Sequence, residues 1–186
     1  IYFDPYEISG DKPADVIFFF FFHFDHCSPD DVAKIQTEQT LIVTEKDSAQ
    51  KLSGNVRVVK PGDQLEENRL TIEAVRAYDI DKDFHPKENG WLGLVVEIDG
   101  IKVYHAGDTD VIEEMKDIQT DISLLPVSGT YVMTADQAVE AALRIKPQIA
   151  IPMHYGSVVG TESDAEKFKA GLAGKVDVHI LQKTAG

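Results

Sequence analysis

The chain has 186 residues and a formal net charge of −14, with 43% hydrophobic and 27% charged residues. These numbers suit one globular domain, so we expect a single domain over residues 1–186. The acidic balance argues against nucleic acid and anionic membranes, which are bound largely through lysine and arginine, and it favours a small-molecule substrate. The single cysteine, Cys27, excludes an internal disulfide and fits a reducing, cytoplasmic compartment. The sequence leaves open whether the chain forms a homo-oligomer.

Short apolar runs and amphipathic stretches alternate along the first half of the chain. The opening "IYFDPYEISG" is typical of a strand end and a turn, so we expect earlier residues to be missing. A strand at 14–20 leads into a helix over 28–36, with Ser28 as its N-cap and Pro29 at its first position. The pattern then predicts a strand at 40–44, a helix at 45–53, and strands at 56–60 and 69–78.

A hairpin forms the middle of the predicted fold. Residues 93–108 contain two alternating strands joined by Asp99-Gly100, a strong short-range hairpin signal. The rest alternates helices at about 111–119, 134–145 and 162–173 with strands at 122–127, 148–153 and 176–181. This order predicts a layered α/β or α+β domain in which helices cover two packed sheets.

Five consecutive phenylalanines, residues 18–22, run directly into a His-x-Asp-His motif. The apolar run Val16–Phe22 is far shorter than the roughly 20 residues of a membrane-spanning helix, so we expect a buried strand. His23 and Asp25 share one face of a regular strand and His26 takes the other, so they converge only in a tight loop. Imidazole and carboxylate suit zinc, iron and manganese, although a solvated polar loop explains the motif alone nearly as well.

Three further residues of metal-ligand type lie in a loop or where an apolar run ends. His85 lies in a loop, Asp108 follows Gly107 in a turn, and His154 follows an apolar strand. Open α/β sheets commonly build sites at strand ends. A carboxylate at Asp108 could bridge two cations about 3.5–4 Å apart. The recurrence of such residues favours a metal site over the solvated loop.

Other candidate residues have simpler explanations. His179 in a strand is expected to be an ordinary core or surface histidine, and His105 to hydrogen-bond a ligand rather than bind a metal. Cys27 is expected to be a buried free cysteine, with a soft-ligand role as the alternative. Several loop residues could shape a pocket, although each alone is better explained as a surface residue: Tyr78, Lys82, Lys87, Ser128, Thr130, Tyr131 and Tyr155.

On these motifs the chain resembles the metallo-β-lactamase-fold hydrolases over nearly its whole length. Their first motif, His-x-His-x-Asp-His, corresponds to "FFHFDH" at 21–26. The segments "FHPKENGWLG", "HAGDTD" and "PMHYG" match later family motifs in the same order. The segments "FDPYEISG", "HCSPDD" and "PMHYGSVVGTESDAEKF" look most like the branch that includes ascorbate-6-phosphate-lactonase-like proteins.

The resemblance implies a four-layer αββα sandwich of the α/β (α+β) class, with N-terminal strands missing, and two metal positions. The implied ligands are His23 and His85 with a further histidine for one ion, Asp25, His26 and His154 for the other, and Asp108 as the bridge. One or two zinc ions are expected, with manganese or iron as alternatives. A metal-bound hydroxide, oriented by Asp25, would attack a carbonyl or phosphoryl centre. The implied function is hydrolysis of a small, anionic lactone or phosphoester.

Phe21 departs from the family pattern, which has histidine there, and phenylalanine offers no lone pair to a metal. The phenylalanine run is explained by a replaced segment, by an error in the sequence, or by a natural relative with one metal. The leading hypothesis is a hydrolase impaired at one metal position, and the alternative is a non-catalytic metal-binding relative. A structural domain without metal would instead scatter these residues in space. The net charge and compact length count against cleavage of RNA or DNA.

Overall fold

The computed structural model describes residues 1–67 and 69–182 and shows two compact units. The N-terminal unit is Ile1–Lys60, and the C-terminal unit contains Pro61–Gln182. The single domain expected over residues 1–186 stays a prediction.

A parallel sheet of four strands, in the order β1-β2-β3-β4, forms the N-terminal unit. Its strands are β1 (Tyr2–Phe3), β2 (Val16–Phe18), β3 (Leu41–Thr44) and β4 (Asn55–Val58). Strand β2 pairs with β1 on one side and β3 on the other, and all its side chains are buried. Continuous apolar runs are typical of such parallel strands, which explains the first part of the phenylalanine run. The predicted strand at 14–20 is therefore real but shorter.

Two short helices, α1 (Pro29–Ile35) and α2 (Lys46–Ala49), complete the N-terminal unit. The predicted cap of α1 is confirmed, because the Ser28 side chain accepts a hydrogen bond from the Asp31 amide and Pro29 opens the helix. The core of this unit combines residues of strands, of a helix and of loops: Ile17 and Ile42, Val32 and Ile35, and Ala14, Phe19 and Cys27, respectively.

A sheet of seven strands, in the order β11-β10-β9-β8-β7-β6-β5, forms the C-terminal unit. Its strands are β5 (Gln64–Glu67), β6 (Leu70–Arg76), β7 (Leu92–Ile98), β8 (Ile101–His105), β9 (Ile122–Pro126), β10 (Ile149–Met153) and β11 (Asp177–Val178). Pairing is antiparallel from β5 to β8 and parallel from β8 to β11. The predicted hairpin is confirmed, with φ of 51° at Asp99 and 82° at Gly100 in the turn between β7 and β8.

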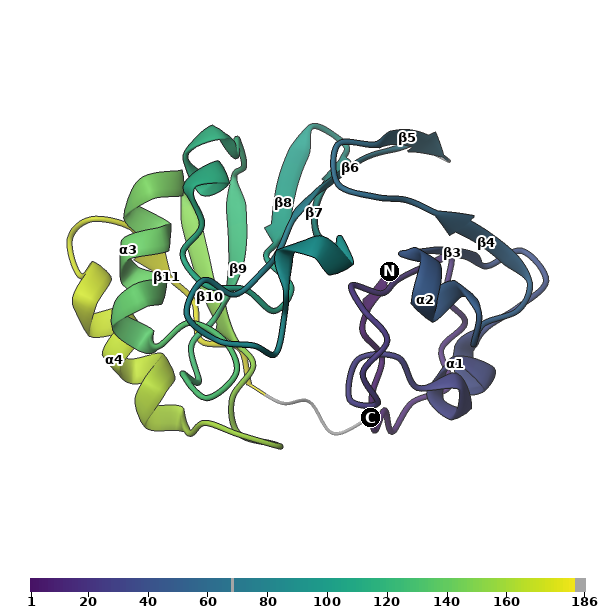
Figure 1. Ribbon diagram of the computed structural model, residues 1–186, viewed down its shortest axis with the longest axis horizontal. Coiled ribbons are helices and arrows are strands. Elements are labelled where there is room, and N and C mark those ends of the chain that lie inside the picture. The colour runs from purple at the N-terminus through teal and green to yellow at the C-terminus, as the bar shows by residue number, and fades with distance from the viewer. Residues whose placement is uncertain (68, 183–186) are drawn as a thin grey trace. The chain divides into compact units, whose positions relative to one another are not determined.

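Two longer helices, α3 (Ala135–Ile145) and α4 (Glu162–Leu172), lie side by side against the β9–β11 part of this sheet (Figure 1). Their apolar faces meet the sheet in one core, to which α3 contributes Ala138 and Ala142 and α4 contributes Phe168 and Leu172. Burial of these faces accounts for the position of both helices, because isolated helices of this length are marginal in water.

Four local predictions need correction in the C-terminal unit. The helix expected at 111–119 is a short 3₁₀ turn, η2 (Glu113–Asp117), because Ile112 is extended and its burial holds the segment in the core. Strand β5 and a second 3₁₀ turn, η1 (Lys87–Asn89), were not predicted. Strand β11 has two residues, so His179 lies beyond it, exposed and 3.0 Å from Asp177 Oδ2.

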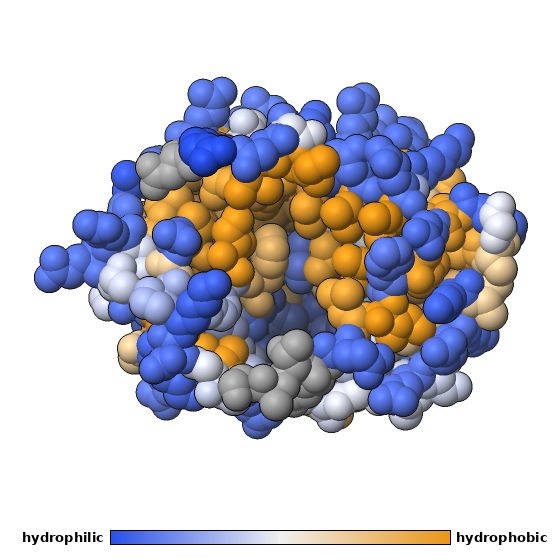
Figure 2. Space-filling model, turned by 180° about the vertical axis from the view of Figure 1, so that it is seen from behind, coloured by the Kyte–Doolittle hydropathy of each residue, from blue (hydrophilic) through white to orange (hydrophobic). Residues whose placement is uncertain are grey.

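Hydrophilic residues cover much of the rim of the face shown in Figure 2, as the high content of charged residues leads one to expect. Within residues 1–67 and 69–182, none of the helices has the length and apolarity needed to cross a membrane.

Candidate metal centre

Three residues of metal-ligand type converge within the C-terminal unit: His85, Asp108 and His154, here called the C-terminal ligand set. His154 directly follows β10, Asp108 lies three residues after β8, and His85 lies on the segment between β6 and β7. Asp108 Oδ2 is 3.5 Å from His85 Nε2 and 3.2 Å from His154 Nε2. Strands β8 and β10 run parallel within one sheet, so their C-terminal ends reach the same edge.

The other ring nitrogen of His85 and of His154, Nδ1, lies within hydrogen-bond distance of a side-chain oxygen. Asp79 Oδ2 lies 3.0 Å from His85 Nδ1 and also accepts the His85 backbone N–H at 3.0 Å. Ser128 Oγ lies 3.0 Å from His154 Nδ1. When Nδ1 donates its proton to such an oxygen, the ring orientation is fixed and the Nε2 lone pair is left as the metal donor. The donor set therefore fits a divalent cation of the zinc type.

Unusual backbone geometry supports the position of His154. Its φ of 59° lies in the left-handed region, which costs a non-glycine residue roughly 1–2 kcal/mol and often marks a functional position. Ser128 is held close to the loop after His154, because a Cβ added at Gly160 would lie 2.6 Å from Ser128 Cβ. Glycine at 160 therefore permits the approach that places the Ser128 hydroxyl beside the imidazole.

Three further candidates lie together in the N-terminal unit: His23, Asp25 and His26, here called the N-terminal ligand set. The His23 carbonyl accepts the amides of His26 at 3.0 Å and Cys27 at 2.8 Å, so these residues form a tight turn rather than a strand. Asp25 Oδ2 is 3.8 Å from His26 Nε2, and His26 Nδ1 is 2.6 Å from Asp4 Oδ2. The Nδ1 atom of His26 therefore contacts a carboxylate, as the Nδ1 atom of His85 does.

Phe21 lies directly against this turn. Its ring centroid is 4.1 Å from that of His26 and 4.7 Å from that of His23, and its side chain is 1% exposed. Carbon therefore occupies the position beside both imidazoles at which the family motif has a ligand. Phe21 therefore offers no donor atom to a metal held by the N-terminal ligand set.

Cys27 behaves as an ordinary buried thiol. Burial raises its pKa to about 11, so the protonated form dominates at neutral pH. His105 Nδ1 accepts a hydrogen bond from the Gly107 amide at 3.2 Å. Its expected role as a hydrogen-bond partner of a metal ligand stays a prediction.

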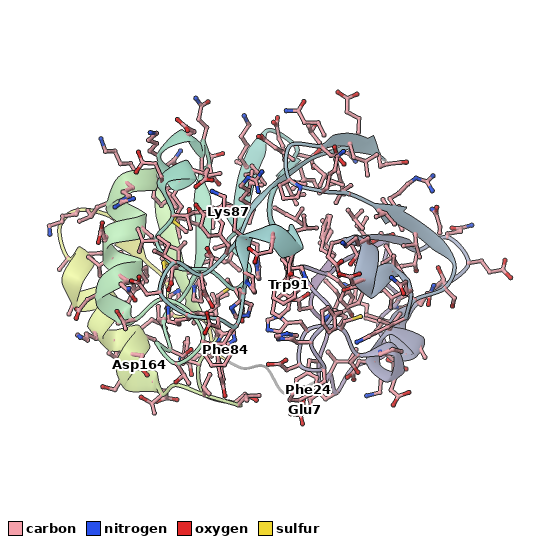
Figure 3. All side chains as sticks on the ribbon, in the orientation of Figure 1. Glu7, Phe24, Phe84, Lys87, Trp91 and Asp164 are labelled. Carbon is pink, nitrogen blue, oxygen red and sulfur yellow. The ribbon has the colours of Figure 1, made fainter. Side chains whose placement is uncertain are left out.

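The lysines and aromatic residues considered as pocket residues have specific partners. Lys82 forms an ion pair with Asp110, and Lys87 donates to Tyr78 Oη and Glu114 Oε1, each at 3.0 Å. Tyr131 meets the edge of Phe84 with ring centroids 4.8 Å apart. Figure 3 shows Phe84, Lys87 and Trp91 on the segment between β6 and β7.

Sequence reasoning missed Asp4 and Asp79, the carboxylates that hold His26 and His85. Asp79 had a weak signal, an acidic residue six positions before the loop histidine. Asp4 lies 22 residues before His26, so nothing in the local sequence pattern indicated the contact.

Comparisons with known proteins identify the family of the chain. Residues 1–154 match the model of a β-lactamase superfamily domain. A metal-dependent hydrolase of Thermoplasma acidophilum is 35% identical over 167 residues, covering 86% of this chain and 73% of that protein. Another, of Thermoplasma volcanium, is 34% identical over 179 residues, covering 93% and 79%.

A solved structure gives the same result for the fold. A Parabacteroides distasonis protein described as a metal-dependent hydrolase superposes with a TM-score of 0.86 at 35% identity, covering 97% of this chain and 84% of the other. The predicted metallo-β-lactamase-like fold of the α+β class is thereby confirmed. The chain therefore belongs to the metallo-β-lactamase superfamily, among its metal-dependent hydrolases.

Proposed function

We propose that the chain hydrolyses a small anionic substrate, a lactone or a phosphoester, with zinc as its metal and manganese or iron as alternatives. One observation carries the proposal: a single carboxylate oxygen of Asp108 is approached by the Nε2 atoms of His85 and His154. The substrate class rests on the sequence resemblance to lactonase-like proteins and on the net charge of −14, which disfavours a nucleic-acid substrate.

Both ligand sets are proposed to contain metal ligands. The proposed ligands are His23, Asp25, His26, His85, Asp108 and His154. Their order along the chain follows the family motifs, and the Nδ1 contacts described above support the role of three of the four histidines. When bound, the metal lowers the pKa of water and stabilises negative charge on the substrate oxygen.

The protein's own groups have separate roles in this proposal. The Asp25 carboxylate accepts a proton from the attacking water and orients it toward the substrate. Asp79 and Ser128 keep their imidazoles in fixed orientations, so that little reorganisation is needed during the reaction. Phe21 removes one ligand, so we expect one tightly bound ion per chain and reduced turnover.

A second candidate function, a non-catalytic metal-binding relative, is favoured by one observation, the burial of Phe21 against His23 and His26. Restoring histidine at position 21 separates the two candidates. A gain of turnover in Phe21→His supports the hydrolase. Metal binding with no turnover in either protein supports the non-catalytic relative.

The test uses zinc-loaded protein and a panel of chromogenic lactones, phosphomonoesters and phosphodiesters. Asp108→Asn should lower kcat/KM by at least about 100-fold, because a negatively charged metal ligand is lost. The matched control is Asp136→Asn, on an exposed residue of α3. Equal turnover in wild type and Asp108→Asn would refute the proposal.

The remaining expectations about partners stay predictions: no nucleic acid, no membrane, a homo-oligomer left open, and a cytoplasmic location.

A further inference from the structure

The segment between β6 and β7, which carries His85, is attached to the residues that directly follow Asp108. Within the C-terminal unit, the Asp110 amide donates to the Tyr78 carbonyl at 3.0 Å. The Asp110 carboxylate accepts the Ile80 amide at 2.9 Å through Oδ2 and pairs with the Lys82 ammonium through Oδ1. Asp110 therefore contacts the segment at three points.

Thr109 adds a second attachment to the same segment. Its Oγ1 accepts the Tyr78 amide at 3.2 Å and lies 3.1 Å from the Tyr78 carbonyl oxygen, and the side chain is fully buried. Asp79 is thus flanked by two anchored residues: Tyr78 is hydrogen-bonded to Thr109 and Asp110, and Ile80 is hydrogen-bonded to Asp110. Because Asp79 itself holds the imidazole and the amide of His85, the contacts form a continuous chain from Asp108 to His85.

The ion pair between Lys82 and Asp110 differs from the surface pairs of this unit. The Asp110 side chain is 4% exposed and that of Lys82 is 20% exposed. In the pair between Lys167 and Asp136 the exposed fractions are 57% and 74%. A buried carboxylate depends on its partners, and removing one of them leaves an uncompensated charge, whereas exposed pairs contribute little.

We propose that Asp110 and Lys82 are positioning residues for His85. They hold residues 78–82 in the conformation that places the His85 imidazole beside Asp108 before any metal binds. Neither residue is assigned contact with the metal or the substrate. The inference rests on the proposed function in one respect, that His85 and Asp108 bind the metal.

The test compares Lys82→Met and Asp110→Asn with Lys167→Met and Asp136→Asn, the same changes made in the exposed pair. The first readout is amide hydrogen exchange of residues 78–86 in the metal-free protein. The second is zinc affinity, measured by competition with a chromogenic chelator. Lys82→Met should accelerate exchange of this segment and weaken zinc binding about tenfold or more, as removal of outer-shell partners does at other metal sites. Both control variants should match wild type.

Conservative replacement separates positioning from general stability. Lys82→Arg keeps a cation opposite Asp110 and should restore zinc affinity to near the wild-type value. If Asp110→Asn fails to fold, Lys82→Met decides the question, because it leaves the hydrogen bond between Asp110 and the Ile80 amide in place. Unchanged exchange and unchanged zinc affinity in Lys82→Met would overturn the proposal.

Failure of the proposed function gives a different result. If wild type binds no zinc but Lys82→Met still accelerates exchange of residues 78–86, the positioning contact stands and the metal-binding role of His85 fails. If wild type binds zinc and Lys82→Met binds it equally well with unchanged exchange, the metal role stands and the positioning role fails.

Discussion

Replacing Asp31 by asparagine should destabilise the N-terminal unit by about 2 kcal/mol at neutral pH. The Asp31 carboxylate is 6% exposed and accepts the amides of Glu7 at 3.0 Å and Ile8 at 3.2 Å. It also accepts the Ser28 hydroxyl and pairs with Lys34, each at 2.7 Å. Burial alone would raise the pKa of Asp31, but hydrogen bonds from Lys34, Ser28 and the two amides outweigh it and lower the pKa from 3.8 to about 2.

This pKa gives both the size and the sign of the effect. Each pH unit of pKa difference between folded and unfolded chains corresponds to about 1.4 kcal/mol, so the shift from 3.8 to about 2 amounts to about 2.4 kcal/mol. Solvent screening reduces the figure toward 2, because the Lys34 side chain is 49% exposed. The folded-state pKa is the lower one, so the stabilisation is present above pH 3.8 and is lost as pH falls toward 2.

The assay is urea unfolding of wild type, Asp31→Asn and Asp30→Asn over a pH series from neutral to acid. Asp30, on the same helix turn, is exposed and serves as the matched control. The free energy of unfolding of Asp31→Asn should fall below that of wild type at neutral pH, and the gap should narrow below pH 3.8. A gap that stays constant across the series, or an equal loss in Asp30→Asn, would refute the reasoning.

Three further predictions concern the C-terminal unit. Phe168→Ala should lower the free energy of unfolding by about 3–5 kcal/mol in denaturant titrations, because the ring is fully buried between α4 and the sheet. Gly160→Ala should weaken zinc binding in chelator competition by displacing Ser128, whereas Gly174→Ala, with a similar φ (73° against 71°) but open space around its Cβ, should not. Asp79→Asn should weaken zinc binding about 10–100-fold by releasing the imidazole that it holds, and wild-type affinity in this variant would contradict that role.

In the fold, the elements that local sequence specifies directly were predicted correctly. The Asp99-Gly100 turn requires positive φ at both residues, and this requirement is visible in the sequence itself. Strand β5 was missed because Gln64–Glu67 is mostly polar and lacks an apolar alternation. It is a strand because it pairs with β6, not because its own residues favour one. The 3₁₀ turn η2 was taken for a helix because the apolar residues in and around it have helical spacing: Val111, Ile112, Met115 and Ile118.

In the candidate site, too, only the features that depend on local sequence could be predicted. Asp108 and His154 could be predicted to lie close together because parallel strands of one sheet end at the same edge. In the structure, Asp108 Oδ2 lies 3.2 Å from His154 Nε2. The supporting contacts could not be predicted, because Asp110 and Lys82 are 28 residues apart and Ser128 and His154 are 26 apart, with no local pattern that joins them. The burial of Phe18–Phe21 was predicted from the apolarity of the run, but Phe22 is exposed, so the prediction was wrong there. The contact of Phe21 with both imidazoles was not predicted.

The most direct test of the central claim is a count of zinc ions per chain by native mass spectrometry, for wild type and Phe21→His. The proposed ligand sets and the position of Phe21 against His23 and His26 predict one ion in wild type and two in Phe21→His. The absence of zinc from both proteins would contradict the metal-binding role of the two ligand sets. Equal counts of one or two in both would contradict the role assigned to Phe21.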